Sequence, residues 1–189
     1  NQQANSAAYA SYPNTIGSPT KLLLANNGDS ASNNSALHLG QQGTYGWQTL
    51  IHEIGHALGL KHPFSAADST GDSAPPPYLS SSEDVTAWTV MSYTNSDAEY
   101  AFQYSPLDIA ALQYLYGPSL TSRTGNDTYT VSNAAANFVW DGAGTDVLDG
   151  SALTQPATLY LTPGYWGYVG TAPAATITSP GQVTVNFGS

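Results

Sequence analysis

The sequence contains no cysteine, which excludes disulfides, thiolate catalysis and thiolate metal ligands. Basic side chains are scarce: Lys and Arg together number 3 against 13 Asp and Glu, for a formal net charge of −10. Such a chain repels phosphate backbones and anionic lipid head groups, so we expect no nucleic-acid partner and no membrane binding, and we favour a bound cation. No apolar run approaches the roughly 18 residues of a membrane-spanning helix, and the start at Asn1 lacks the basic and apolar regions of a signal peptide, so we expect neither feature here.

The residues that are present suffice for a folded domain with a buried core. Of the 189 residues, 41% are hydrophobic and 11% are aromatic, so a wholly disordered chain is excluded. Only 8% are charged, which leaves Ser, Thr, Asn, Gln and Gly to cover the surface, an unusual mixture for a cytosolic protein. The length suits one domain, or one domain with a small appendage.

A helix is predicted over residues 106–116. Ser105 is suited to its N-cap, Pro106 to its first position, and Asp108 lies near the positive end of the helix dipole. Gly117, followed by proline, ends it. The residues predicted to face the core are Ile109, Leu112 and Leu115.

Short strands are predicted on both sides of the helical region, where apolar and aromatic residues alternate or cluster between turn residues. They are Ala7–Tyr12, Leu22–Ala25, Ala36–Leu39, Tyr129–Val131, Phe138–Trp140, Leu159–Leu161 and Val183–Phe187. A long exposed loop is predicted over 65–84. We therefore predict an α+β fold in two parts: residues 1–118, which hold the helices, and a β-rich segment, residues 119–189.

The run from His52 to His62 is the most informative in the chain. Apolar residues at helical spacing, from Trp47 to Leu60, predict an earlier helix through this run. His52 and His56, four residues apart on one face, can both offer imidazole nitrogens to one ion. Gly59 can enter the left-handed region that ends a helix, which brings His62 back toward that ion.

Glu53 lies one position round the helix from His52, where its carboxylate can touch a water in the open coordination position of the ion. Zinc is the expected metal, because three imidazoles with an open fourth position suit it, although cobalt, nickel or copper could occupy the same ligands in vitro. The competing interpretation is three histidines, buried or at the surface, on an unrelated helix.

The pattern His-Glu-x-x-His-x-x-Gly-x-x-His is the metzincin motif, and the run HEIGHALGLKHP over 52–63 resembles the serralysin group of secreted bacterial zinc endopeptidases. Met91, the single methionine, stands in the run TVMSY, which is similar to the methionine-containing turn beneath the zinc in that family. Residues 8–13 look like its substrate-binding edge strand, and residues 108–117 look like the C-terminal helix of its catalytic unit. The resemblance implies a metzincin-like unit with a partial sheet and two helices, acting on proteins or peptides outside the cell.

The resemblance also implies a mechanism. Glu53 would act as the general base toward a zinc-bound water, and Tyr93 would be the phenol that binds zinc at rest and then the oxyanion of the tetrahedral intermediate. Ordinary core packing for Met91 and an ordinary aromatic role for Tyr93 are the alternatives.

A calcium site is predicted in the second part. The run DGAGTDVLD over 141–149 resembles one copy of the nonapeptide of calcium-binding β-rolls, and residues 123–127 resemble the serralysin segment that shares a calcium ion with it. The resemblance implies the ligands Arg123, Gly125, Asp127, Asp141, Gly144 and Asp146. Asp127 and Ala143 depart from the family pattern, and a plain Asp-Gly turn is the alternative.

Only 51 residues precede His52, room for two or three strands and no backing helix. We therefore expect either an N-terminal portion elsewhere, such as a separate fragment of the same polypeptide, or a reduced catalytic unit. An active zinc endopeptidase is the leading hypothesis. The alternatives are a calcium-dependent structural or adhesive β module with a non-functional peptidase remnant, and a metal-binding interaction protein. The intact Glu53 argues against a non-functional site.

Overall fold

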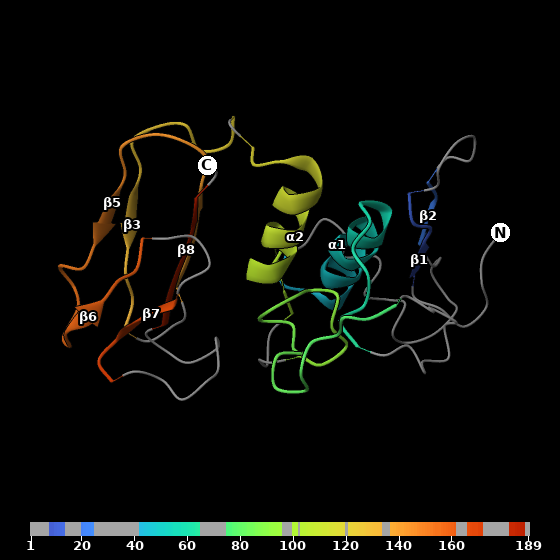
Figure 1. Ribbon diagram of the computed structural model, residues 1–189, viewed down its shortest axis with the longest axis horizontal. Coiled ribbons are helices and arrows are strands. Elements are labelled where there is room, and N and C mark those ends of the chain that lie inside the picture. The colour runs from blue at the N-terminus through green and yellow to red at the C-terminus, as the bar shows by residue number, and fades with distance from the viewer. Residues whose placement is uncertain are drawn as a thin grey trace. The chain divides into compact units, whose positions relative to one another are not determined.

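The computed structural model describes residues 8–13, 20–24, 42–64, 75–95, 100–101, 103–119, 121–133, 137–161, 166–171 and 182–187. The chain forms two compact units, Asn1–Asp108 and Ile109–Ser189 (Figure 1). In its described residues it contains two α-helices and several small sheets, so the structure is of the mixed α+β kind. The assignment of residues 1–118 and 119–189 to a peptidase unit and a β-rich segment stays a prediction.

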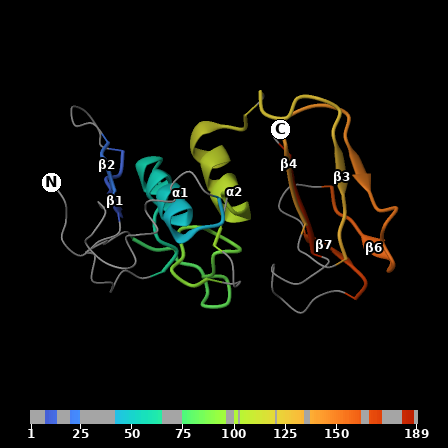
Figure 2. The same cartoon turned by 180° about the vertical axis from the view of Figure 1, so that it is seen from behind.

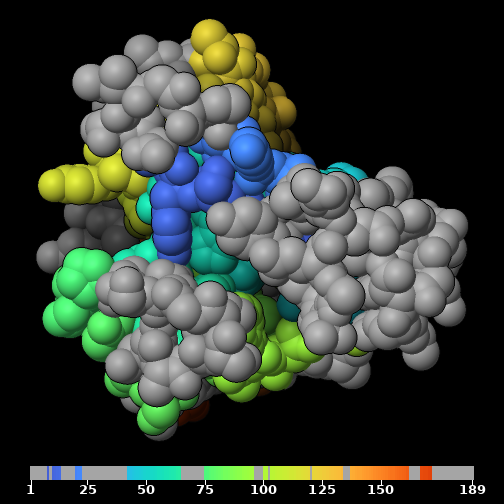
Figure 3. All heavy atoms as spheres, turned by 90° about the vertical axis from the view of Figure 1, so that its right-hand side faces the viewer, coloured from blue at the N-terminus to red at the C-terminus, as the bar shows by residue number. Residues whose placement is uncertain are grey.

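The first unit contains a two-stranded antiparallel sheet and the first helix. Strand β1, Ala8–Ala10, pairs with β2, Leu22–Leu24, with Ala8 opposite Leu24. Figure 3 shows the two strands, in blue, lying over the helix α1, in teal. Both predicted strands are confirmed, although each is shorter than predicted. The predicted strand Ala36–Leu39 falls outside the described residues.

Helix α1 spans Tyr45–Ala57, and local sequence explains both of its ends. Thr44 caps the start, where its Oγ1 accepts a hydrogen bond of 3.2 Å from the backbone of Trp47. At the other end Gly59 adopts φ 97°, and the backbone N–H groups of Gly59 and Leu60 donate to the carbonyls of His56 and Gly55, each at 2.9 Å. These two bonds form a Schellman motif, which reverses the chain immediately before His62.

Helix α2 spans Pro106–Tyr116, as predicted. Asp108 Oδ2 accepts a hydrogen bond of 2.9 Å from the backbone of Ser105, while the Ser105 hydroxyl donates to the Thr86 carbonyl at 2.7 Å. Ile109 is buried, but Leu115 is 49% exposed, so the prediction that Leu115 faces the core is wrong. The physical reason is that apolar residues occur nearly all round this helix, so their spacing selects no single buried face.

After the last residues of α2, the second unit consists of short β-strands (Figure 2). Strand β3, Thr128–Thr130, pairs in parallel with β5, Val147–Asp149. The other sheet has the order β4-β8-β7-β6, with β4 at Asn137–Asp141, β6 at Ala157–Thr158, β7 at Trp166–Val169 and β8 at Gln182–Phe187. Strands β4 and β8 are parallel, and the other neighbours are antiparallel.

A small core of Val131 and Val139, with Tyr129, Leu148, Leu153 and Val169 packed against it, holds this unit together. The prediction of a strand at Leu159–Leu161 is wrong, because the ladder to β7 ends at Thr158 and the next three residues are exposed. Strands β5, β6 and β7 were not predicted. Strand β5 lies within the calcium-type nonapeptide, β6 has only two residues, and β7 contains Gly167, which lowers strand propensity.

Candidate metal centre

Three buried histidines converge at the C-terminal end of α1. His52 and His56 lie one turn apart on the helix, and the Schellman motif brings His62 back beside them. His62 Nε2 lies 3.2 Å from His52 Nε2 and 3.1 Å from His56 Nε2. In a tetrahedral zinc site with metal–nitrogen bonds of about 2.1 Å, two ligand nitrogens lie about 3.4 Å apart. The spacing of the nitrogens therefore fits one metal ion bound between them.

The outer nitrogens of two rings fix the direction of the inner ones. His52 Nδ1 lies 2.8 Å from the Val90 carbonyl oxygen, and His56 Nδ1 lies 2.8 Å from the Leu60 carbonyl oxygen. A carbonyl only accepts, so each Nδ1 carries the proton and each Nε2 presents a lone pair. Burial, reinforced by the neighbouring His56, lowers the pKa of His52 to about 3, which keeps the ring neutral. Converging lone pairs repel one another, and a divalent cation removes that repulsion, so these donors fit zinc.

Glu53 follows His52 on the same helix and is buried. Burial raises the pKa of its carboxyl to about 7, although a hydrogen bond from the backbone N–H of Ala10 opposes the rise. A carboxylate with a pKa near neutrality is suited to take up and release a proton at physiological pH. Strand β1 therefore contacts the centre directly, through the backbone of Ala10.

Tyr93 lies beside two of the histidines. Its ring is stacked against His52 at 5.7 Å between centroids and lies edge-on to His62 at 4.7 Å, and 57% of the residue is exposed. Phe64, which the sequence did not single out, stacks in parallel on His62 at 5.0 Å and also touches Tyr93. The exposed phenol thus adjoins the candidate ligands from the solvent side, within an aromatic group of Phe64, His62 and Tyr93.

The turn that contains Met91 lies beneath the histidines. Met91 is 1% exposed, and its Sδ packs so closely on Gly55 that a Cβ there would lie 2.6 Å from the sulfur. Sequence reasoning missed the residues that hold this turn. Asp108 accepts from the Thr89 hydroxyl at 2.6 Å and from the Val90 backbone at 2.8 Å, although its position had suggested only a helix-dipole role. The sequence did offer one signal: Asp108 stands next to apolar residues of a helix that packs into the core, and a buried carboxylate needs hydrogen-bond donors nearby.

The predicted calcium residues come together in the second unit. Carboxylate oxygens of Asp127, Asp141 and Asp146 lie within 4.8 Å of one another, and among the described residues this is the second group, after the histidines, that could hold a metal ion. The backbone of Asp127 donates to Asp146 Oδ1 at 2.9 Å, and that of Ala143 to Asp141 Oδ1 at 3.0 Å.

Backbone geometry joins the two segments at the remaining predicted positions. Arg123 adopts φ 48° and its carbonyl accepts from Ala143 at 3.4 Å, while Gly144 adopts φ 134° with its Cα against the Gly125 carbonyl.

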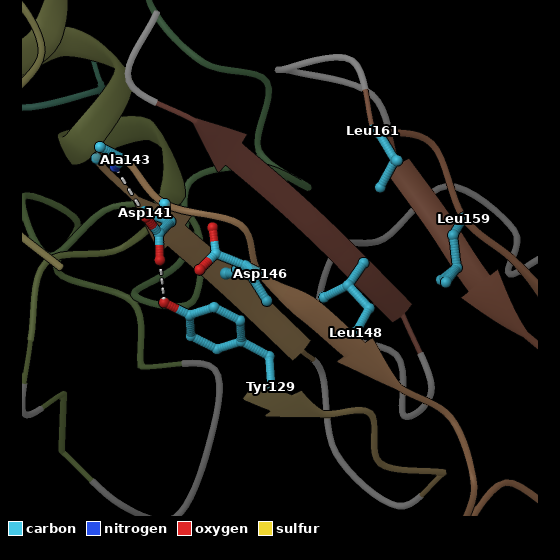
Figure 4. Close-up of a pocket in the computed structure, with 10 residues that line it drawn as sticks. Tyr129, Asp141, Ala143, Asp146, Leu148, Leu159 and Leu161 are labelled. Carbon is cyan, nitrogen blue, oxygen red and sulfur yellow. Dashed lines mark hydrogen bonds between the residues drawn. The ribbon is translucent and has the colours of Figure 1, made fainter. Parts of the chain in front are cut away.

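The acidic cluster borders a cavity of about 580 Å³. Figure 4 shows Asp141 and Asp146 close to the Tyr129 ring, with Leu159 and Leu161 across the cavity. The Tyr129 hydroxyl donates to Asp141 Oδ2 at 2.5 Å, and burial together with this bond raises the pKa of Tyr129 to about 12. Both features keep the phenol protonated beside the carboxylate.

Three buried imidazoles, two of them on α1 beside the Glu53 carboxylate and the third brought back by the chain reversal, lie next to a methionine-containing turn and define a metallopeptidase-type centre. Comparison with known proteins agrees. The family model Reprolysin_5, described as Metallo-peptidase family M12, matches residues 1–104. The chain therefore belongs to metallo-peptidase family M12, and its relatives identify it as a serralysin-type metzincin, which confirms the predicted resemblance.

Those relatives include Serralysin of Proteus mirabilis, 40% identical over 151 residues that cover 68% of this chain and 30% of the relative. Serralysin B of Dickeya chrysanthemi is 33% identical over 86% of this chain and 37% of its own length. Metallopeptidase AprA of Pseudomonas marginalis is 34% identical over 89% of this chain and 40% of its own length. The chain thus spans between 30% and 40% of the length of these three relatives.

Proposed function

We propose that this chain carries the catalytic centre of a zinc-dependent endopeptidase that hydrolyses peptide bonds in proteins. The observation that carries the proposal is the convergence of the Nε2 atoms of His52, His56 and His62 at 3.1–3.2 Å, with Glu53 on the next helical position. Serralysin names among the relatives support the same activity.

The histidines would hold the zinc, which when bound supplies Lewis-acid activation of a water molecule and of the substrate carbonyl. Glu53 takes a proton from the attacking water and returns it to the leaving amine nitrogen. The raised pKa of Glu53 suits both halves of this transfer. Tyr93, at the exposed side of the histidines, would donate a hydrogen bond from its hydroxyl to the oxyanion that develops on the substrate.

Strand β1 is proposed as the substrate edge. Its residue Ala10 is buried and contacts Glu53 through the backbone, so an extended peptide beside β1 would lie next to the proton acceptor. The predicted partner is such a protein or peptide substrate. Action outside the cell is part of the proposal, supported by the low content of charged residues. Among the described helices, neither is long and apolar enough to cross a bilayer.

The test compares the wild type with Glu53→Gln on an unfolded protein substrate. Glutamine preserves the shape of the side chain but takes up no proton, so we expect kcat to fall by about 10²–10⁴-fold while zinc binding persists. Glu83→Gln, at an exposed position whose carboxylate bonds only its own turn, is the matched control. Hydrolysis that survives Glu53→Gln unchanged would remove the proposal. A zinc-loaded wild type that hydrolyses no peptide bond would favour instead a structural β module with a peptidase remnant, or an interaction protein.

A second proposal is a calcium ion held by Asp127, Asp141 and Asp146 with main-chain oxygens of Arg123, Gly125 and Gly144. Hard oxygen donors grouped within 4.8 Å support it. We expect calcium, and not magnesium at the same concentration, to raise the melting temperature, and Asp146→Asn to abolish the rise. Asp149→Asn is the control, because Asp149 lies on the same segment outside the cluster and accepts from the Ser151 backbone. An identical melting temperature with calcium and with chelator would exclude the ion.

A further inference from the structure

A continuous chain of hydrogen bonds connects the buried carboxylate of Asp108 to the imidazole of His52. The Thr89 hydroxyl donates to Asp108 Oδ1 at 2.6 Å. The same hydroxyl oxygen accepts from the Met91 backbone N–H at 3.1 Å. The carbonyl at the other side of that peptide group, which belongs to Val90, lies 2.8 Å from His52 Nδ1. Every residue in this series of hydrogen bonds lies in the first unit.

Burial strengthens the hydrogen bonds of this series. Asp108 and Thr89 are 2% and 5% exposed, and Val90 is fully buried, so water does not compete for these groups. Hydrogen bonds in series polarise one another: a peptide whose N–H donates to a charged partner network has a more negative carbonyl oxygen. The Val90 carbonyl is therefore a stronger acceptor for the Nδ1 proton of His52, and His52 Nε2 becomes a better donor to a metal.

Asp108 also fixes the turn in space. Its Oδ2 accepts from the backbone N–H groups of Val90 and Ser105 at 2.8 and 2.9 Å, so one carboxylate connects the start of α2 to the residues that lead into Met91. The carbonyl that orients His52 consequently has little freedom to rotate.

We propose that Thr89 and Asp108 are positioning residues of the metal centre, which orient and polarise the Val90–Met91 peptide group and through it set the metal affinity of His52. This inference rests on the proposed zinc function, because it assigns those residues to the same centre. It goes beyond the metal ligands and Glu53 in naming a carboxylate that acts through a hydroxyl and a peptide group.

The central variant is Thr89→Val, which keeps the β-branched shape and removes the hydroxyl. We expect the dissociation constant for zinc, measured by competition with a chromogenic chelator, to rise about 10-fold. Thr89→Ser restores the hydroxyl and should return the constant to within about 2-fold of the wild type.

Ser105→Ala is the matched control. Ser105 is also buried, and its hydroxyl donates to a backbone carbonyl, that of Thr86, at 2.7 Å, but this hydroxyl takes no part in the series of hydrogen bonds that leads to His52. We expect Ser105→Ala to lower the melting temperature while leaving the zinc dissociation constant within about 2-fold of the wild type. Equal zinc affinities in Thr89→Val and Ser105→Ala would overturn the inference.

A double variant tests the series arrangement independently. Asp108→Asn keeps the shape of the side chain, but its amide donates to the Thr89 oxygen and so removes the hydroxyl's acceptor. If Thr89 and Asp108 act in one chain, Thr89→Val combined with Asp108→Asn should weaken zinc binding no more than the larger single effect. Multiplicative losses would show separate contributions and contradict the proposal.

The absorption spectrum of the cobalt-substituted protein provides a readout that a change in folding alone would not move. The Thr89→Val spectrum should shift, and the Ser105→Ala spectrum should match that of the wild type. A wild-type protein that binds no zinc would overturn the proposed function itself. Failure of this inference alone would look different, because the wild type would bind zinc and Thr89→Val would bind it equally well.

Discussion

Gly55→Ala is the sharpest test of how the Met91 turn packs beneath the metal centre. Gly55 lies on α1 between Glu53 and His56, and a Cβ at this position would lie 2.6 Å from Met91 Sδ. Met91 is 1% exposed, so its side chain cannot move into solvent to relieve the contact. The added methyl must therefore displace the Met91 side chain within the core, the turn or the helix.

Two opposing terms set the size of the effect. Overpacking a core by one carbon costs about 1–3 kcal/mol, and replacing glycine by alanine inside a helix contributes about 1 kcal/mol of stability. We expect Gly55→Ala to lower the free energy of unfolding by about 1 kcal/mol net. In a Met91→Ala background the steric term disappears, and the same substitution should raise stability by about 1 kcal/mol.

The assay is denaturant unfolding followed by tryptophan fluorescence, in the wild type, both single variants and the double variant. The change of sign between backgrounds, equivalent to a coupling of about 2 kcal/mol, identifies the contact between Gly55 and Met91. If Met91→Ala leaves too little folded protein, Met91→Val provides a less severe background. Equal effects of Gly55→Ala in both backgrounds would refute the close packing described here.

Three further outcomes are expected. Gly144→Ala should destabilise the second unit by about 2–4 kcal/mol, because φ is 134° and the new Cβ would collide with the Gly125 carbonyl. The control Gly125→Ala, whose Cβ would meet nothing within 4 Å, should change the unfolding free energy by less than about 0.5 kcal/mol. Chemical denaturation compares the two variants, and equal losses of stability would contradict the geometry. Burial raises the pKa of Asp108 from 3.8 to about 6, so the folded state holds this proton more tightly than the unfolded state. Relative to Asp108→Asn, the unfolding free energy of the metal-free protein should therefore fall by about 2.4 kcal/mol as the pH rises from 4 to 7, and a flat or rising difference would exclude the shift. With free zinc at about 100 times its dissociation constant, removal of the zinc should lower the unfolding free energy by about 2.7 kcal/mol. Calorimetry with and without a zinc chelator measures this difference, which should be absent from a variant with both His52→Ala and His56→Ala.

The helices were predictable because their signals are local. Thr44, Gly59 and Pro106 lie next to the boundaries that they set, and capping depends on hydrogen bonds within a few residues. The same short range explains the metal centre, since a separation of four residues on a helix and a glycine reversal suffice to bring three imidazoles together. The strands were less predictable: Leu159–Leu161 has the right composition, yet the ladder to β7 ends before it.

Thus the sequence by itself determined the two helices, the chemistry of the three histidines and Glu53, and the acidic character of the second candidate site. Only the tertiary structure decided which groups support them. The Val90 carbonyl at His52 Nδ1 and the Asp108 carboxylate at Thr89 lie 38 and 19 residues from their partners in sequence. Spacing along a chain fixes neighbours within a helix or turn, whereas contacts between distant segments depend on how their surfaces pack, which is why the outer hydrogen bonds of the metal centre emerged only from the fold.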